Sequence, residues 1–324
     1  MINKIFMISK LRFIKVGVAP IIFLCLAFLM SGCYESPPIS PGGYYYPNTT
    51  NNYNPVPNVV QNYDFENYRG FSGYLNQGTY LNIPPNTFVD NNGVTISGRI
   101  NLSAKEIYKK SDMFYYAIST VADSNLLESG GMLYLNATYY NSAVNIKPGV
   151  HITASFPVKG TPVKMQFFNG ATSKSNMISW SLDKDSVNNN ISIVKDSTHN
   201  GASYFYNAYF SSFQWINCDH FLNQLPLTTV KVNLTNASAY NEVSCAFVFE
   251  ENSVAMLNPD TGTNNFIIGN MPVGQKVTIV IHGKKKGAIF GALVPVTLTA
   301  NMKETINLLQ MTDQSFYTKL KALD

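Results

Sequence analysis

The chain has 324 residues, of which 13% are charged, and its formal net charge is +4. Because Lys4, Lys10, Arg12 and Lys15 all belong to the N-terminal leader, the remainder is close to neutral. It therefore lacks the clustered basic face that nucleic-acid binding requires. The abundance of Tyr and Phe beside Asn, Ser and Thr favours a β-rich extracytoplasmic protein of about two domains.

The N-terminal leader begins with basic residues and continues as an almost wholly apolar run from Val16 to Met30. It closes with Leu29-Met30-Ser31-Gly32-Cys33. This order of an aliphatic residue, small residues and a cysteine resembles the lipobox of bacterial lipoprotein signals, with Met30 where Leu is usual. The resemblance implies a signal peptide over 1–32, cleavage before Cys33, diacylglycerol on its thiol and fatty acylation, such as palmitate, of the new N-terminus.

Two other interpretations of the leader remain open at this stage. Ser31-Gly32 also suits an ordinary signal peptidase, which would release a protein without lipid. A spanning helix needs about 20 apolar residues, whereas this run is shorter and contains Pro20. Tyr34 stands where some bacteria place the Asp that retains lipoproteins in the inner membrane, so we expect an outer-membrane location.

Residues 33–63 are rich in Pro, Asn and Tyr and show almost no aliphatic periodicity. Such a segment cannot bury enough apolar surface to offset the entropy of ordering it. We expect a disordered tether, with a reach on the order of 90 Å if extended. Tyr44-Tyr45-Tyr46 has the composition of an aromatic contact to a sugar or peptide, but an unstructured linker is the favoured interpretation.

A first β-sandwich domain is expected over 64–200. Alternation from Val94 to Leu102 predicts a half-buried strand, and further short strand-like runs follow between turn signals. Between Ser103 and Met113 we expect one or two helical turns, because Ser103 and Glu106 have the spacing of a capping box. The further strands are expected at 79–83, 132–139, 151–156, 163–168, 178–182 and 191–194.

A second β-sandwich domain is expected over 201–324. Its strands are predicted at 228–234, 243–250, 266–268, 276–282 and 288–300, with a hairpin turn at Gly283-Lys284-Lys285-Lys286-Gly287. Thr312 should begin a short C-terminal helix that carries Phe316, Leu320 and Leu323 on one stripe. The fold class is therefore mainly β, with two tandem sandwiches and a terminal helix.

Two stretches of the body resemble bacterial surface lipoproteins of unknown activity. The segment 78–90 with Gly93, Gly98 and Ser129-Gly130-Gly131-Met132 is similar to an immunoglobulin-like sandwich of the type found in ankyrins and netrin receptors. The segment 215–221, Trp-Ile-Asn-Cys-Asp-His-Phe, resembles a motif that follows that sandwich. The second domain resembles the regulatory-like modules of carboxypeptidases. These resemblances imply fold and location only. Relatives of this sandwich sometimes adjoin self-cleaving domains with a His-Phe-Ser sequence, in which the Ser hydroxyl is the nucleophile. Here Leu222 follows His220-Phe221 and offers no nucleophile, so self-cleavage is excluded.

The cysteines allow more than one arrangement. Cys25 leaves with the signal and Cys33 takes the lipid, so Cys218 and Cys245 remain as either a disulfide or two buried thiols. A disulfide would stabilise the fold by about 3 kcal/mol. Cys218 and His220 have a ligand-like spacing, but one further Cys makes a poor zinc site, and we expect no metal.

Catalytic motifs are not evident in the sequence. The four histidines are scattered, and no nucleophile elbow, P-loop or zinc-protease motif occurs. A glycosidase would need two carboxylates at a suitable separation, which a sequence does not establish. Residues singled out for other roles are Trp180 and Trp215 as possible glycan contacts, and Ser186 and Ser197 as possible O-glycosylation acceptors.

The sequence favours a non-enzymatic, lipid-anchored envelope protein with a structural, adhesion or scaffolding role. Its partners would be a membrane, through the N-terminal lipid, and a protein or glycan that the sequence does not identify. The alternative hypothesis is a glycan-binding surface lipoprotein. No cofactor is expected.

Overall fold

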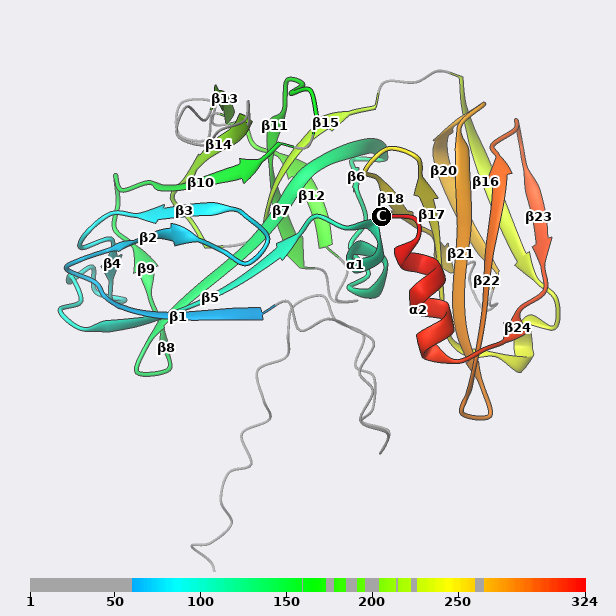
Figure 1. Ribbon diagram of the computed structural model, residues 1–324, viewed down its shortest axis with the longest axis horizontal. Coiled ribbons are helices and arrows are strands. Elements are labelled where there is room, and N and C mark those ends of the chain that lie inside the picture. Colours follow the sequence, from blue (N-terminus) through cyan, green and yellow to red (C-terminus); the bar gives the residue numbers. More distant parts are fainter. Residues whose placement is uncertain are drawn as a thin grey trace, which may run out of the picture. The chain divides into compact units, whose positions relative to one another are not determined.

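The computed structural model describes residues 60–158, 160–172, 178–184, 191–195, 204–213, 215–222, 226–259 and 265–324. Over these residues the chain is mainly β, with two sandwiches and a C-terminal helix, as the sequence predicts (Figure 1). The leader, Cys33 and the tether up to residue 59 lie outside the described residues. Residues 60–63, expected to end the tether, instead belong to a strand that pairs with β5, so the folded body begins at Val60.

One sheet of the first sandwich runs in the order β1-β5-β7-β15-β11-β12-β6, with β8 paired to β7. The facing sheet runs in the order β13-β14-β10-β3-β2, and β4 pairs with β9 beside them. The strands are β1 (Val60–Glu66), β2 (Phe71–Tyr74), β3 (Tyr80–Ile83), β4 (Phe88–Val89), β5 (Arg99–Ile107), β6 (Val121–Ala122), β7 (Asn125–Tyr139), β8 (Ser142–Ala143), β9 (Asn145–Ile146), β10 (Ile152–Pro157), β11 (Gln166–Thr172), β12 (Ile178–Leu182), β13 (Ile191–Lys195), β14 (Tyr204–Phe210) and β15 (Trp215–Phe221).

The core of the first sandwich lies between these two sheets. Alternate residues of β5 and β7, such as Leu102 and Leu135, meet Leu81 of β3 and Phe156 of β10. Period-two burial is the reason these runs form strands, because each strand puts one row of apolar side chains into the same layer.

The second sandwich has one sheet in the order β18-β17-β21-β22-β24 and another in the order β19-β20-β16-β23. Its core contains Val232, Phe247 and Ile279. The β21–β22 hairpin turns at Lys286 and Gly287, both at positive φ, as the Gly-Lys-Lys-Lys-Gly sequence predicts. The elements are β16 (Leu227–Leu234), the 3-10 turn η1 (Ala237–Ala239), β17 (Asn241–Phe249), β18 (Val254–Met256), β19 (Asn258–Pro259), β20 (Phe266–Pro272), β21 (Lys276–Lys285), β22 (Ala288–Thr297), β23 (Lys303–Ile306) and β24 (Leu309–Gln310).

The strand pairing moves the boundary between the sandwiches. It was expected at residue 200, but β14 and β15 pair with β10, β11 and β7 of the first sandwich. The first strand of the second sandwich is β16, which begins at Leu227. The boundary therefore falls between Phe221 and Leu227, because hydrogen bonding to the first sheets continues past the change in sequence texture.

The helix expected from Ser103 is not formed. Residues 103–107 continue β5, whose backbone pairs with β1 on one side and β7 on the other. Two ladders of hydrogen bonds outweigh a local capping pattern. The helix in this region is α1 (Lys110–Tyr115), which begins after the strand ends.

A third apolar cluster joins the two sandwiches. It combines Met132 and Trp215 of the first sandwich with Val248 and Val280 of the second, and α1 and α2 (Asp313–Lys321) also contribute. Thr312 is the N-cap of α2, because its side chain accepts a hydrogen bond from the backbone N–H of Ser315 at 3.1 Å. The helix buries Phe316 and Leu320. The predicted apolar stripe thus packs on the β17-β21-β22 sheet and on α1.

Candidate functional site

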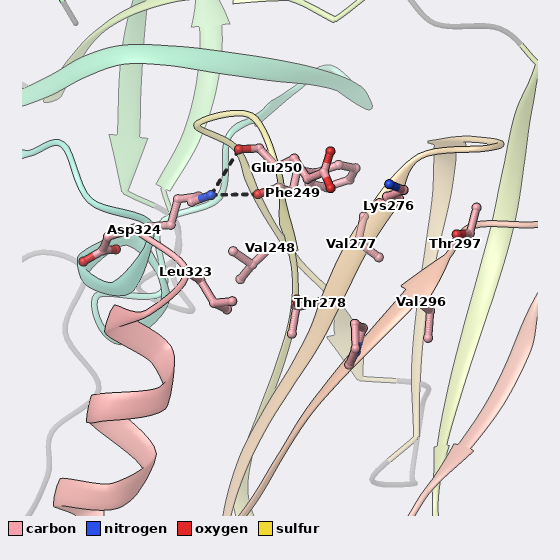
Figure 2. A pocket seen from close by; sticks show the side chains of 12 residues that line it. Val248, Phe249, Glu250, Lys276, Val277, Thr278, Val296, Thr297, Leu323 and Asp324 are labelled. Carbon is pink, nitrogen blue, oxygen red and sulfur yellow. Dashed lines mark hydrogen bonds between the residues drawn. The ribbon is translucent and has the colours of Figure 1, made fainter.

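A groove lies where the outer face of the β17-β21-β22 sheet extends beyond α2 (Figure 2). Its volume is about 590 Å³, within the range of small-molecule sites in proteins. Apolar side chains form part of its wall, and polar groups from α1, the C-terminal end of α2 and the strand ends form the rest. The lining residues are Lys110, Val248, Phe249, Glu250, Lys276, Val277, Thr278, Pro295, Val296, Thr297, Leu323 and Asp324.

Lys110 forms one wall of the groove and connects the two sandwiches. It is 8% exposed, and its Nζ donates hydrogen bonds to the carbonyl oxygens of Phe249 at 2.9 Å and Glu250 at 3.3 Å (Figure 2). Burial lowers the pKa of Lys110, and the carboxylates of Asp324, Glu251 and Glu250 oppose that shift. The amine is therefore held as part of the junction and is not a free charge.

Asp324 is also engaged by the junction. Its Oδ1 accepts a hydrogen bond from the backbone N–H of Ser111, and its Oδ2 accepts one from the Ser111 hydroxyl, both at 2.8 Å. This pair fastens the end of α2 to the first turn of α1. Next to it, burial raises the pKa of Asp112 from 3.8 to about 6, against the nearby Lys109 charge.

The groove carries polar groups besides those of the junction. Its remaining polar groups are the exposed Glu250 and Lys276 and the hydroxyls of Thr278 and Thr297. None of the lining residues is a His, Cys or Ser. Within the described residues, no group of three or more His, Cys, Asp or Glu side chains is arranged to hold a metal ion.

Sequence reasoning missed a buried polar cluster at the junction. In the β7–β15 ladder, Gly130 and Gly131 face the single residue Cys218, which makes a β-bulge. Gly131 has φ +139° and its α-carbon faces Tyr108 and Phe156 so closely that a Cβ would clash. The two motifs singled out in the sequence, Ser-Gly-Gly and Trp-Ile-Asn-Cys-Asp, therefore meet in space at this bulge.

Three side chains flank the bulge. The Ser129 hydroxyl donates to Asn217 Oδ1 at 3.0 Å, and Asn217 Nδ2 donates to Asp219 Oδ2 at 2.5 Å. Asp219 is fully buried, and this burial raises its pKa well above the usual carboxyl value, so the group is favoured in its neutral form. Ser129 and Asn252 also exchange hydrogen bonds, Ser129 N–H to Asn252 O and Asn252 Nδ2 to Ser129 O, which tie the bulge to the second sandwich.

The possible glycan contacts named from the sequence are wrong. Trp180 and Trp215 are each 2% exposed, and both pack against the α-carbon of Gly170, where a Cβ would lie 2.6 Å from each side chain. Trp180 also donates its indole N–H to the carbonyl of Ser119 at 2.6 Å. Both rings belong to the cluster between the sandwiches, so neither is available as a sugar platform.

The possible disulfide is not formed. Cys218 lies in the core of the first sandwich and Cys245 in the core of the second, and both are buried free thiols. Burial raises the pKa of each thiol, which keeps it protonated and unreactive. His220 is partly exposed near the end of β15, and its Nε2 lies 3.4 Å from Glu128 Oε2.

Three residues named from the sequence are not part of the described structure. Cys33, Ser186 and Ser197 lie outside the described residues. None of the helices in the described part of the chain is both long enough and apolar enough to span a bilayer.

No protein-family model matches the chain, and no curated protein matches it.

Proposed function

We propose that this chain is a lipid-anchored cell-envelope protein, and that its β body acts by binding or scaffolding and not by catalysis. The N-terminal sequence supports the anchor, since the basic start, the apolar run and Leu-Met-Ser-Gly-Cys33 follow the order of a lipoprotein signal. Two or three acyl chains hold a protein to a bilayer without a spanning segment, because each buried methylene contributes about 0.8 kcal/mol. We propose the outer membrane as the location.

The connected junction is the observation that carries the scaffolding role. The backbone N–H of Thr120 in the first sandwich donates to the carbonyl oxygen of Val254 in the second, and the Val254 N–H donates to the Thr120 hydroxyl oxygen, which lies 2.8 Å from that of Ser253. Lys110 adds hydrogen bonds to Phe249 and Glu250. Together with the shared apolar cluster, these contacts make a body that can transmit force between an anchor and a partner without yielding at a linker.

The chemistry of the groove supports a role without catalysis. Asp324, one of its two carboxylates, has both side-chain oxygens occupied by Ser111, and the Lys110 amine is occupied by two carbonyls. A general acid or base needs a free proton-transfer position facing the substrate. Because a glycosidase needs two available carboxylates and the exposed Glu250 is the one left in the groove, we do not propose glycoside hydrolase activity for it.

The anchor is tested by fatty-acid labelling in the native host. Cells fed a radiolabelled palmitate analogue should label the wild-type protein and retain it in the membrane fraction. Cys33→Ser should abolish the label and leave the uncut precursor, whereas Cys25→Ser, a cysteine of the same leader outside the lipobox, should be labelled like the wild type.

Two results would contradict the anchor. An unlabelled wild-type protein cleaved after Gly32 would identify an ordinary secreted protein, and equal labelling of Cys33→Ser would place the lipid elsewhere. Proteolysis of intact cells followed by mass spectrometry then distinguishes surface display, with released peptides, from a periplasmic location.

A further inference from the structure

The outer face of the β13-β14-β10-β3-β2 sheet is a second surface with a distinctive composition. This sheet, which Figure 1 shows as β13, β14, β10, β3 and β2, buries one row of apolar side chains in the first core, and the alternate residues face away from that core. The cross-strand register aligns the outward residues in rows. One row contains Ser72, Asn82, Thr153 and Tyr209. The next row contains Tyr74, Tyr80, Ser155 and Asn207.

These two rows, which we name the tyrosine–amide face, carry no ionisable acid or base other than the phenols. Elsewhere the strands present charged residues outward: Asp64 and Arg99 lie on β1 and β5, and Lys231 and Lys303 lie side by side on β16 and β23. A charged partner would therefore find no complementary charge within the face, whereas an uncharged partner would lose no ion hydration on binding.

The aromatic groups of the face are accessible and preoriented. Tyr74 is 53% exposed and Tyr209 is 38% exposed. Tyr80 stands edge-on to Tyr74, with ring centroids 5.0 Å apart, which fixes the Tyr74 ring. Tyr74 on β2 and Tyr209 on β14 are three strand spacings apart, or about 14 Å across the sheet. Two separate rings therefore offer contacts to an extended ligand.

The polar groups between the rings are amides and hydroxyls. The Ser72 hydroxyl donates to Asn82 Oδ1 at 2.6 Å, which holds that amide in place and leaves its Nδ2 outside this hydrogen bond. Asn207 and Ser155 lie opposite each other in the next row. Such groups both donate and accept, as sugar hydroxyls do, and the apolar face of a sugar ring packs on an aromatic ring.

From this arrangement we infer that the tyrosine–amide face binds an uncharged polysaccharide, laid across β2, β3, β10 and β14. Tyr74 and Tyr209 stack on its sugar rings, and Asn82 and Asn207 hydrogen bond to its hydroxyls. This inference names the surface and partner class of the proposed binding role. It rests on that role for its biological setting but is independent of the lipid anchor, so either can fail alone.

Binding is tested with the purified full-length protein in detergent. Affinity electrophoresis in gels containing glucomannan, galactomannan, glycogen or hydroxyethyl cellulose, followed by calorimetry with matching hexasaccharides, should reveal at least one ligand. Tyr74→Ala combined with Tyr209→Ala should weaken binding roughly tenfold or more, because the two rings supply most of the stacking surface. The affinity should change little between about 50 mM and about 500 mM NaCl.

Tyr140→Ala is the matched control, since Tyr140 is 83% exposed but lies in the β7–β8 turn, outside the face. It should bind like the wild type. Asn207→Ala, which leaves both rings in place, should also weaken binding and guards against a folding defect in the double variant. Three results would overturn the inference. The protein could bind none of the probes, the double variant could keep the wild-type affinity, or binding could be restricted to acidic or sulfated polysaccharides.

Discussion

The sequence patterns predicted the positions and roles of buried polar side chains less well than those of any other residues in this protein. Glu106 is fully buried in β5, where the sequence suggested a helix cap. Its carboxylate accepts hydrogen bonds from Gln61 Nε2 at 2.8 Å, Gln77 N–H at 2.7 Å and Thr79 N–H at 3.0 Å. These donors come from three separate positions in the chain, so a buried carboxylate that would be costly alone fixes a turn of the first sandwich.

Asp112 should make the folded state less stable at neutral pH. Its pKa is raised from 3.8 to about 6, so the stability it contributes is complete below pH 3.8 and is lost as the pH rises through about 6. The difference between the two pKa values corresponds to about 3 kcal/mol at most. Asp112→Asn should therefore raise the free energy of unfolding by up to about that amount at pH 7.5.

Urea unfolding of the two proteins at a series of pH values measures this effect. The gain from Asp112→Asn should be absent near pH 3.5, where both side chains are neutral, and should reach its full size above about pH 6. A difference that does not vary with pH would mean that the amide acts by altered packing and not by removing a charge.

At the scale of elements, strand pairing decided what local patterns left open. The alternation in 94–102 predicted a strand, and the observed β5 runs from Arg99 to Ile107. The strand lies further along the chain than predicted because β5 must align with both β1 and β7. A local sequence pattern does not indicate which strands will be neighbours. The terminal helix was predictable because its cap and its apolar stripe are both local features.

The packing of α2 should depend on one side chain. Phe316 is fully buried against Phe114, Tyr115 and His282, and its ring lies over Gly291, where a Cβ would come within 2.7 Å. Phe316→Ala should cost about 3 to 5 kcal/mol, since a large core side chain is lost and a cavity remains. Hydrogen exchange should show faster exchange in α2 before the sheets are affected.

Lys319→Ala is the matched control for this variant, because Lys319 is exposed on the same helix and Ala preserves helix propensity. It should change the free energy of unfolding by less than about 0.5 kcal/mol. Equal losses in the two variants would show that helix formation, and not the packing of Phe316, limits stability.

At the scale of the whole molecule, the two sandwiches should unfold together. The apolar cluster that joins them contains Met132 and Trp215 from one and Val248 and Val280 from the other, so neither sandwich can unfold without exposing the other's buried surface. The two free thiols report on this directly, because Cys218 lies in the first core and Cys245 in the second. We expect alkylation of both to begin at the same urea concentration.

Thr120→Val should lower both midpoints equally, because it removes the hydroxyl that accepts from the backbone N–H of Val254, at a cost of about 1 to 3 kcal/mol. Thr305→Val, on an exposed position of β23, should leave them unchanged. Peptide mass spectrometry measures each thiol separately. Midpoints that differ in the wild type would mean that the sandwiches unfold as independent domains.

Parts of the candidate sites could be predicted from sequence, and parts could not. The Ser-Gly-Gly and Trp-Ile-Asn-Cys-Asp segments stood out as motifs, but nothing local indicated that Ser129, Asn217 and Asp219 would meet at one bulge. Trp180 and Trp215 were plausible ligand contacts because exposed and buried tryptophans look alike in a strand. The groove combines residues from α1, three strands and the end of α2, which are far apart in the chain.

The sequence by itself determined the fold class, most strand positions, the hairpin turn at Gly283–Gly287 and the capped helix at Thr312, because period, turn residues and caps act over a few neighbouring residues. The tertiary structure alone decided the boundary after Phe221, the burial of both tryptophans, the separation of the two cysteines and the rows of the tyrosine–amide face. Those features depend on which strands pair and in what register, and pairing joins residues that the linear order keeps apart.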